Sequence, residues 1–493
     1  MRSPLRASIL LGGGSALSIL AAVVSAKAWA LILGPGGYGQ LALWQALVKL
    51  TGLIAGLGIG TGIVRFGSGL VNQRPDGLAH WRRAAWALAF ALGGAAAALM
   101  IVFRRPLAGA ALPGSPLASA MPWAAVATLA TVVYGAQTGI LNAYHHVGAL
   151  AKITALGSWA GAITGIAIVA VWREAGIPAA VLAGAGAYCL VAQLYLRRRL
   201  PAARAEWSWQ ATAAAMRSLL RFGLPYTLAM AAGTGAQLAM PFVVLWALGT
   251  ESVGFYRAAS AIAVSYLTLV LTALAQDYFP RLSAVREDAS ALVAIINEQN
   301  RVILLLALPL ILLMLAVAPL LMPLLYSGRF APAIVVLEWQ LAGDVLKVAS
   351  WIMSFAILAR CKPSWFLLTE FVGGAGLLAS GWLGMRWLGL VGVGLAFPAT
   401  YALYYMVCHL LIRRSVKLVW TPFNVRLLVL GLAAVLAVEL VPQVLGPAWR
   451  TPLAACLTVA AFGVSLRFLP AGGAPAGWRG WARTLALRQF RGN

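Results

Sequence analysis

Long apolar runs separated by short polar stretches follow one another along nearly the whole chain. A run of about 20 apolar residues is long enough to cross a bilayer as a helix. The runs are rich in Ala, Leu and Gly and show no strand-like alternation, so helices rather than a barrel are expected. The pattern predicts an all-α polytopic membrane protein with about fourteen transmembrane helices, at residues 8–33, 40–64, 84–103, 119–141, 150–172, 176–196, 218–248, 253–277, 301–327, 332–358, 364–385, 388–412, 424–444 and 450–469.

Two stretches about 215 residues apart are similar to each other. Each connects one apolar run to the next through the spacing Gly-x4-Gly, which places Gly34 and Gly39 in the first half and Gly249 and Gly254 in the second. Other matches keep nearly the same offset, including basic segments at the ends of corresponding runs. We therefore predict an internal duplication. The four glycines are candidate hinges, although tight helix connections explain them equally well.

The repeat also predicts the domain organisation. An even number of helices in each copy gives both copies the same orientation, so they form parallel repeats whose pseudo-twofold axis runs along the membrane normal. We expect two pseudo-symmetric six-helix lobes, two extra C-terminal helices and a cytoplasmic basic tail that is either amphipathic or disordered. The corresponding ranges are 1–200, 215–415, 420–470 and 471–493.

Composition and charge placement support this class. Hydrophobic residues make up 62% of the chain and charged residues 10%, far from the roughly 25% charged residues of a soluble domain. Most of the 37 Lys and Arg residues fall in alternate loops, which predicts that those loops and both termini are cytoplasmic. The net charge of +25 therefore reflects topology, and we expect no nucleic-acid partner. The first apolar run continues past a cleavage-like segment to Leu33, so we expect a retained helix.

The motifs of enzymes are missing from the sequence. It contains no nucleotide-binding loop of the G-x-x-x-x-G-K-[ST] type, no H-E-x-x-H and no G-x-S-x-G. Hydrophilic connections reach only about twenty residues, and the Cys and His residues lie in or near the ends of apolar runs, so we expect neither catalytic residues nor a metal site. A membrane glycosyltransferase, polymerase or ligase is the alternative from another class.

Four basic residues lie at least four residues from either end of their predicted helix: Lys27, Lys49, Arg257 and Lys347. A charge in a spanning helix costs roughly 3 kcal/mol on insertion scales and usually faces a cavity or a partner. We predict that these cations bind an anionic substrate. Alternatively, Asp344 neutralises Lys347 three residues away, and the long side chains of Lys27 and Arg257 reach the nearby membrane surface.

Polar residues extend two of these positions into stripes. Gln45 precedes Lys49 by one turn, while Ser260 and Thr268 follow Arg257 along the same run. Such stripes suit a water-filled passage, so we expect Gln45, Ser260 and Thr268 to line one.

Several of these segments together resemble polysaccharide flippases of the Wzx type, which belong to the multidrug/oligosaccharidyl-lipid/polysaccharide exporter superfamily. The resemblance covers helices 1–12 and is moderately specific. It rests on Gly34-x4-Gly39-Gln-Leu-Ala-Leu, Leu57-Gly58-Ile-Gly60 and Arg65 in the first half, and on Val253-Gly254-Phe-Tyr256-Arg-Ala258-Ala259 and Phe279-Pro280-Arg281-Leu282 in the second.

The resemblance implies a two-lobed transporter of the bacterial inner membrane. It would flip a polyprenyl-pyrophosphate-linked oligosaccharide to the periplasmic leaflet for O-antigen, capsule or exopolysaccharide synthesis, by alternating access around a cationic cavity. Lys27, Lys49, Arg257 and Lys347 suit such a cavity, but none lies in a motif that transfers a role. No cofactor is implied, ion coupling by H⁺ or Na⁺ is proposed for some members, and a polysaccharide polymerase and chain-length proteins are candidate partners. Fourteen helices instead of twelve keep a lipid II flippase as an alternative, beside a multidrug antiporter.

Overall fold

The computed structural model describes residues 4–70, 77–111, 119–200, 208–361 and 363–468, and these residues form helices and connections without a strand. The predicted basic tail at 471–493 lies outside the described residues. The principal helices are α1 (Pro4–Gly56), α2 (Ile59–Gly67), α3 (Gly77–Val102), α4 (Arg104–Ala111), α5 (Met121–Ala143), α6 (Val147–Trp172), α7 (Ile177–Arg199), α8 (Trp209–Met230), α9 (Ala236–Leu248), α10 (Thr250–Ala284), α11 (Ala289–Leu325), α12 (Ala333–Arg360), α13 (Pro363–Val416), α14 (Pro422–Leu445) and α15 (Arg450–Phe468).

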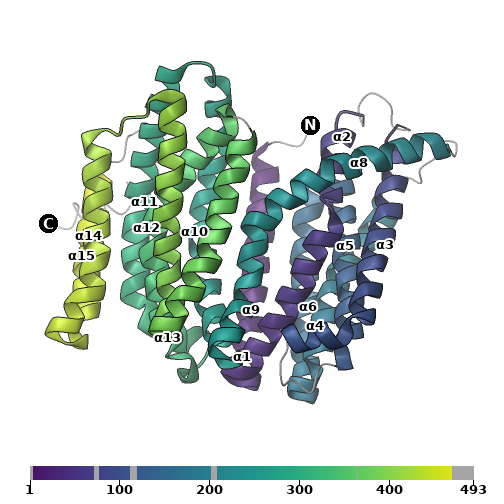
Figure 1. The fold of residues 1–493 in the computed structure, drawn as a ribbon, viewed down its shortest axis with the longest axis horizontal. Coiled ribbons are helices and arrows are strands. Elements are labelled where there is room, and N and C mark those ends of the chain that lie inside the picture. Colours follow the sequence, from purple (N-terminus) through teal and green to yellow (C-terminus); the bar gives the residue numbers. More distant parts are fainter. Residues whose placement is uncertain (1–3, 71–76, 112–118, 201–207, 362, 469–493) are drawn as a thin grey trace. The chain divides into compact units, whose positions relative to one another are not determined.

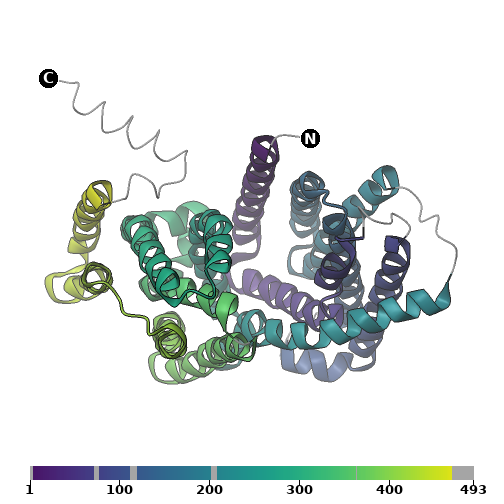
Figure 2. The same ribbon diagram turned by 90° about the horizontal axis from the view of Figure 1, so that it is seen from above.

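Eleven apolar segments of the described chain are long enough to cross a membrane. Three of them contain a break in the helical backbone: at Gly34 in α1, at the 3₁₀ turn Arg173–Gly176 between α6 and α7, and at Gly389 in α13. Figures 1 and 2 show the two arms of α1 as separate rods. Dividing these three segments gives the fourteen helices that the sequence predicts, so the chain is an all-α, multi-pass membrane protein.

The breaks repeat along the chain with nearly identical backbone angles. Gly34 has φ 66° and ψ −175°, and Gly249 has φ 85° and ψ 176°. Arg173 has φ 48° and ψ −129°, and Gly389 has φ 57° and ψ −131°. The two pairs are 215 and 216 residues apart, close to the offset of the predicted repeat, and Arg173 adopts a positive φ that is uncommon for a residue with a side chain. The internal duplication therefore includes the geometry of the helix connections.

Contacts divide the chain into two compact units. Unit 1 comprises residues 1–254 and 325–329, and unit 2 comprises residues 255–324 and 330–493. The first unit includes α8 and α9 because α8 packs on α2 and α3, while α9 packs on α1 (Figure 2). At one close approach Gly223 lies against the carbonyl of Leu57, where no larger residue fits. The boundaries 1–200 and 215–415 of the predicted lobes remain a prediction.

Unit 2 is built around α11 and α12. In their most apolar windows, 67% and 72% of residues are buried, against 11% in α15, so α12 is a central helix and α15 a peripheral one. Asn424 at the start of α14 donates to both the backbone and the side-chain oxygen of Asn297 in α11, at 2.9 and 3.0 Å. The Ser465 hydroxyl of α15 bonds the carbonyl of Leu305. These polar contacts fix α14 and α15 to the second unit.

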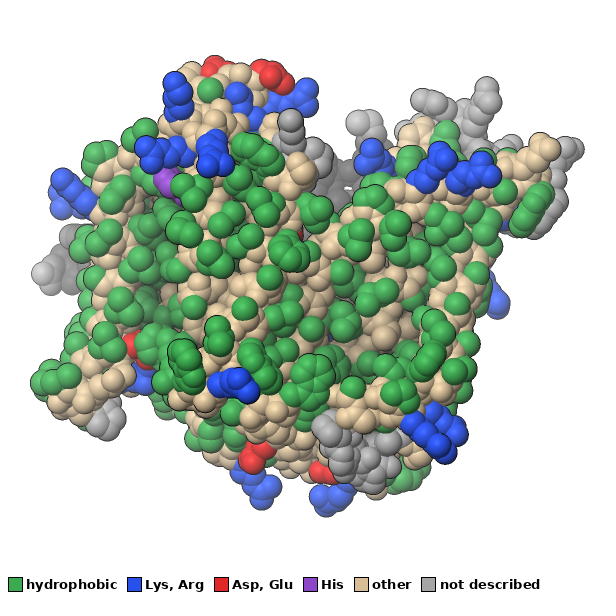
Figure 3. Space-filling model, viewed as in Figure 1, with side chains coloured by type: hydrophobic (Ala, Val, Ile, Leu, Met, Phe, Trp, Pro, Cys, Tyr) green, Lys and Arg blue, Asp and Glu red, His purple; other side chains and the backbone are tan. Residues whose placement is uncertain are grey.

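Lipid-facing character is evident on both units. Large side chains such as Val171 of unit 1 and Trp387 of unit 2 are 71% and 82% exposed, which is costly in water but favourable against acyl chains. Figure 3 shows hydrophobic side chains over the helices of each unit, with Lys and Arg side chains gathered mainly at helix ends.

Candidate functional site

A fully buried carboxylate lies in the middle of α12. Asp344 is 0% exposed, and its two oxygens have different partners. Oδ2 accepts a hydrogen bond from the Tyr266 hydroxyl of α10 at 2.5 Å, and Oδ1 accepts one from Lys347 Nζ at 3.0 Å. Removing a carboxylate from water is expensive unless such donors replace it. The alternative in which Asp344 neutralises Lys347 is the arrangement found in the structure.

Aromatic rings complete the surroundings of Lys347. Its Nζ lies 5.2 Å from the ring centre of Phe397 and 5.9 Å from that of Tyr401, both on α13. Those two rings pack edge to face at 4.8 Å. A cation between a carboxylate and two π faces is held by electrostatic attraction on both sides. The Lys347 ammonium is thus the centre of a cluster that joins α10, α12 and α13.

Polar contacts continue on either side of this cluster. Gln340, one turn before Asp344, donates to the Ser260 hydroxyl at 3.0 Å, so Ser260 is bound to α12. Thr268 is exposed and its hydroxyl donates to the backbone carbonyl of its own helix at Val264. Arg257 is half-buried and forms no salt bridge within the described chain. Of the residues predicted in unit 2, Lys347 lies on α12 and Ser260 of α10 is hydrogen-bonded to that helix.

The predicted residues of unit 1 lie on the two arms of α1. Lys27 is half-buried on the first arm, whereas Lys49 is exposed and Gln45 half-buried on the second. Gln45 precedes Lys49 by four residues, so both lie on one helix face. Unit 1 thus presents two cations within membrane-spanning helices.

The candidate hinge glycines form a close backbone crossing. A Cβ atom on Gly39 would overlap the carbonyl oxygen of Thr250, and one on Gly254 would overlap that of Pro35. Pro35 and Thr250 each follow the positive-φ glycine of their own copy, Gly34 or Gly249. The two copies of Gly-x4-Gly therefore pack against each other reciprocally, as small residues allow in membrane helices.

A second buried charge cluster was not predicted from the sequence. Arg450, at the start of α15, contacts Glu338 of α12 at 2.8 Å and Glu439 of α14 at 2.5 Å. Both carboxylates are at most 5% exposed. In the sequence, Glu338 and Glu439 lie within apolar runs, where a charge usually has a partner. Their common partner is distant from Glu338 in sequence, so it could not be identified without the fold.

Both clusters consist of oppositely charged side chains in direct contact. Asp344 and Lys347 neutralise each other, and the Tyr266 hydroxyl donates to the second oxygen of the carboxylate. The described residues contain no group of three His, Cys, Asp or Glu side chains suited to a metal ion. The charges of both clusters are thus paired inside unit 2.

Residues 28–335 match the model of the family described as polysaccharide biosynthesis protein, which is more than half of the chain. The chain belongs to this family. It is also 24% identical over 429 residues to the lipid III flippase of Escherichia coli (strain K12), an alignment that covers 82% of this chain and 96% of that relative. A lipid III flippase of Shigella flexneri matches to the same extent. Both of these relatives are flippases, which agrees with the expectation of a transporter rather than an enzyme.

Solved structures agree on the fold. The lipid II flippase MurJ in an inward closed conformation has a TM-score of 0.69 at 14% identity, covering 94% of this chain and 99% of that one. An inward-facing multidrug resistance MATE family transporter of the MOP superfamily also has a TM-score of 0.69, at 16% identity, and covers 81% and 94%. The first match leaves about 30 residues of this chain unmatched, fewer than α14 and α15 contain together. It therefore includes part of these extra helices.

Proposed function

We propose that the protein flips a polyprenyl-pyrophosphate-linked oligosaccharide across the bacterial inner membrane for synthesis of a surface polysaccharide such as O-antigen, capsule or exopolysaccharide. The observation that carries this proposal is the alignment with the lipid III flippase over 96% of that relative. The membership in a polysaccharide biosynthesis family agrees with it. The fold is shared with drug transporters, so it supports transport but not the choice of substrate.

In this proposal the membrane-embedded cations bind the pyrophosphate. Lys27, Lys49 and Arg257 attract the anion, and the polyprenyl tail stays in lipid. Lys347 takes part only when it leaves Asp344, since its charge is otherwise neutralised by that carboxylate. Ammonium and guanidinium groups suit phosphate oxygens because they combine charge with several N–H donors.

Alternating access completes the proposed mechanism. The substrate enters from the cytoplasmic side, where the loop charges also place both termini. The Gly-x4-Gly connections act as hinges, and the polar residues Gln45, Ser260 and Thr268 line the passage. H⁺ or Na⁺ supplies the driving force, and a polymerase and chain-length proteins receive the product.

A leaflet-accessibility assay with purified protein in proteoliposomes tests the function. Defined polyprenyl-pyrophosphate-linked sugars, lipid II and an organic cation are supplied in turn, with H⁺ and Na⁺ gradients imposed separately. Movement of the linked sugars is expected. Movement of lipid II alone, or of the organic cation alone, would replace the proposal with one of its alternatives.

A substitution at Lys49, with a matched control at Lys152, tests whether a membrane-embedded cation binds the substrate. We expect Lys49→Gln to slow flipping by about tenfold, the effect of losing one charged hydrogen bond. Lys152→Gln removes the same charge from an exposed position near the start of α6 and should leave the rate unchanged. Equal rates for the wild type and Lys49→Gln would reject the role of Lys49 without rejecting the transport function.

A further inference from the structure

Two buried glutamates of unit 2 share a single arginine. Glu338 lies near the start of α12, Glu439 near the end of α14, and Arg450 at the start of α15. The Nη2 atom of Arg450 contacts Glu338 Oε2 at 2.8 Å and Glu439 Oε2 at 2.5 Å. One guanidinium thus joins three helices, of which α14 and α15 pack against each other (Figure 1).

The charges of these three residues do not balance. Two carboxylates carry two negative charges, whereas Arg450 carries one positive charge. The charges that act on Glu338 are those of Arg450 and Glu439, and the charge that acts on Glu439 is that of Arg450. Both glutamates are at most 5% exposed, and an uncompensated charge at such a position is costly. The cluster therefore needs one further positive charge.

Neighbouring helices supply no further cation to the two glutamates. Lys347 of α12 pairs with Asp344, and among the described residues neither Arg257 of α10 nor Arg386 of α13 forms a salt bridge with a glutamate of the cluster. Further charged residues of the adjoining helices lie at the other end of these helices: Arg301, Glu370, Arg413, Arg414, Arg426 and Arg467. The missing charge is therefore not supplied by a described side chain of unit 2.

Two carboxylate oxygens of the cluster point independently to a bound proton. Oε1 of Glu338 and Oε1 of Glu439 are enclosed and receive no hydrogen bond within the described chain. A buried acceptor without a donor is unfavourable, because it has lost its hydrogen bonds with water. A proton bound to one of these oxygens removes the excess charge and supplies a donor at the same point.

A proton suits the cluster better than a metal ion does. Ca²⁺ and Mg²⁺ bind about six or more oxygen ligands. The cluster has two free carboxylate oxygens, and the described residues contain no group of three His, Cys, Asp or Glu side chains that could hold a metal ion. The Arg450 side chain is 23% exposed, so the cluster also lies next to the surface from which a proton enters.

We infer that Glu338, Glu439 and Arg450 form a proton-binding site that controls how firmly α14 and α15 are attached to α12. The proton binds Oε1 of one glutamate, and the cluster is then neutral. Release of the proton to solvent leaves one net negative charge among buried groups, which weakens the contact between the helices. Unfolded glutamates have already released their protons at neutral pH, so the folded protein binds one proton more and its stability falls as pH rises.

Infrared difference spectroscopy of the full-length protein in nanodiscs, titrated from mildly acidic to alkaline pH, tests this inference. Wild type should show a protonated-carboxyl band that disappears as pH rises. Glu338→Gln and Glu439→Gln should each remove this band, because Arg450 then balances the remaining glutamate and keeps it ionised. Loss of the band in both variants shows that the proton belongs to the pair of glutamates.

The matched control is a cluster of similar composition on the surface. Arg281 contacts Glu298 at 2.7 Å and Asp277 at 3.4 Å, and all three side chains are at least 37% exposed. Water solvates the excess charge there, so Glu298→Gln should leave the band unchanged. A band that survives either glutamine substitution in the buried cluster, or that Glu298→Gln also removes, overturns the inference. A band change that appears in Na⁺ but not in K⁺ would identify a metal site and overturn it as well.

Hydrogen–deuterium exchange measures the attachment of α14 and α15. At alkaline pH their amides should exchange faster in wild type than in Glu439→Gln, by up to about tenfold for each pH unit, the effect of one proton. At mildly acidic pH the two proteins should exchange alike. Equal exchange at both pH values rejects control of the attachment by the proton. Neither measurement involves flipping, so failure here leaves the proposed transport function untouched.

Discussion

Gly39 and Gly254 occupy corresponding places in the two copies of the repeat, and their backbones cross in direct contact. A Cβ atom added to Gly39 would lie 2.9 Å from the backbone nitrogen of Gly254, and one added to Gly254 would lie 3.3 Å from that of Gly39. Each glycine also meets the carbonyl group that follows the turn of the other copy. The crossing therefore has no room for a side chain on either residue.

Substitution at this crossing should be destabilising. We expect Gly39→Ala and Gly254→Ala each to cost about 1–3 kcal/mol, the usual range for overpacking a tight contact. The midpoint of thermal unfolding in detergent measures the effect. Gly36→Ala is the control, because an added Cβ there has no neighbour within 4 Å. Similar midpoints for Gly36→Ala and Gly39→Ala would show that the crossing relaxes.

The equivalent turns at Arg173 and Gly389 give predictions of opposite sign. Arg173 adopts a positive φ that suits glycine, so Arg173→Gly should stabilise the protein by about 1 kcal/mol. Gly389→Ala should destabilise it by a similar amount or more. Arg173→Ala keeps the backbone strain while removing the charge, and should not show the gain. A gain equal to that of Arg173→Gly would locate the effect in the side chain instead.

Variants at Asp344 and Lys347 distinguish a role of Lys347 in folding from a role in transport. Lys347→Met leaves a buried carboxylate without its cation and should cost about 3–5 kcal/mol. Asp344→Asn/Lys347→Met removes both charges and should recover most of that loss. If Lys347 binds substrate, the double variant unfolds like wild type but flips about tenfold more slowly. A wild-type flipping rate in the double variant would confine Lys347 to a role in folding.

Arg450 should contribute to the stability of the protein as strongly as the Asp344–Lys347 pair, because it joins α15 to α12 and α14. Arg450→Gln leaves Glu338 and Glu439 buried together without their shared cation, at a cost of about 3–5 kcal/mol. Adding Glu439→Gln should restore part of the stability, since one negative charge is then removed. Arg105→Gln, at an exposed position, should change the unfolding midpoint little. An additive loss in the double variant would contradict a shared site.

The environment of Asp288, outside the membrane-spanning segments, predicts that the stability of the protein depends on pH. Its Oδ1 accepts hydrogen bonds from the Ser290 hydroxyl and from two backbone amides at the start of α11, and these lower the pKa of the carboxyl below its ordinary 3.8. A lowered pKa in the folded state adds stability above the unfolded value, and this is lost as pH falls through the folded value. The difference in unfolding midpoint between wild type and Asp288→Ala should therefore shrink below pH 3.8.

Asp288→Asn is the control for this experiment. It keeps an oxygen that can cap the helix but has no titrating carboxyl. Its difference from Asp288→Ala should stay nearly constant as pH falls. If the unfolding midpoint of Asp288→Asn also approaches that of Asp288→Ala as pH falls, the titrating group is a residue other than Asp288.

Much of the fold was predictable because every helix that crosses a bilayer needs about 20 apolar residues, and runs of this length are visible in the sequence. Apolar runs of spanning length gave the helices, and Gly-x4-Gly gave the repeat, since Gly34 and Gly249 are needed for a positive φ. The Arg173 turn carried no such signal, because arginine is not typical of that conformation. The packing of α8 on α2 and α3 depends on contacts between distant residues, such as Gly223 with Leu57, that no local pattern reveals.

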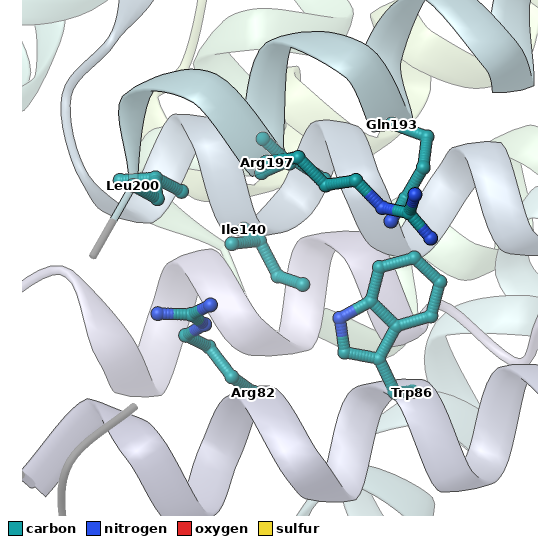
Figure 4. Close-up of a pocket in the computed structure, with 7 residues that line it drawn as sticks. Arg82, Trp86, Ile140, Gln193, Arg197 and Leu200 are labelled. Atoms are coloured by element: carbon teal, nitrogen blue, oxygen red, sulfur yellow. The ribbon is translucent and has the colours of Figure 1, made fainter. Parts of the chain in front are cut away.

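The candidate site was predictable only in part. Asp344 and Lys347 are one helical turn apart, so their ion pair follows from spacing alone. The rings of Phe397 and Tyr401, the Tyr266 hydroxyl and the Arg450 guanidinium come from helices that are remote in sequence. Their contribution requires the three-dimensional arrangement. Basic residues in the loops were interpreted only as signs of topology, although Arg82 and Arg197 also line a cavity with Trp86 and Gln193 (Figure 4).

The matching turns at Arg173 and Gly389 have a consequence for the history of the molecule. The two copies now form the same connection with different residues, one of which suits the backbone and one of which does not. The path of the backbone is therefore shared by the two copies even where their residues differ. Such turns should be recognisable in distant relatives by their backbone angles after sequence similarity between the halves has vanished.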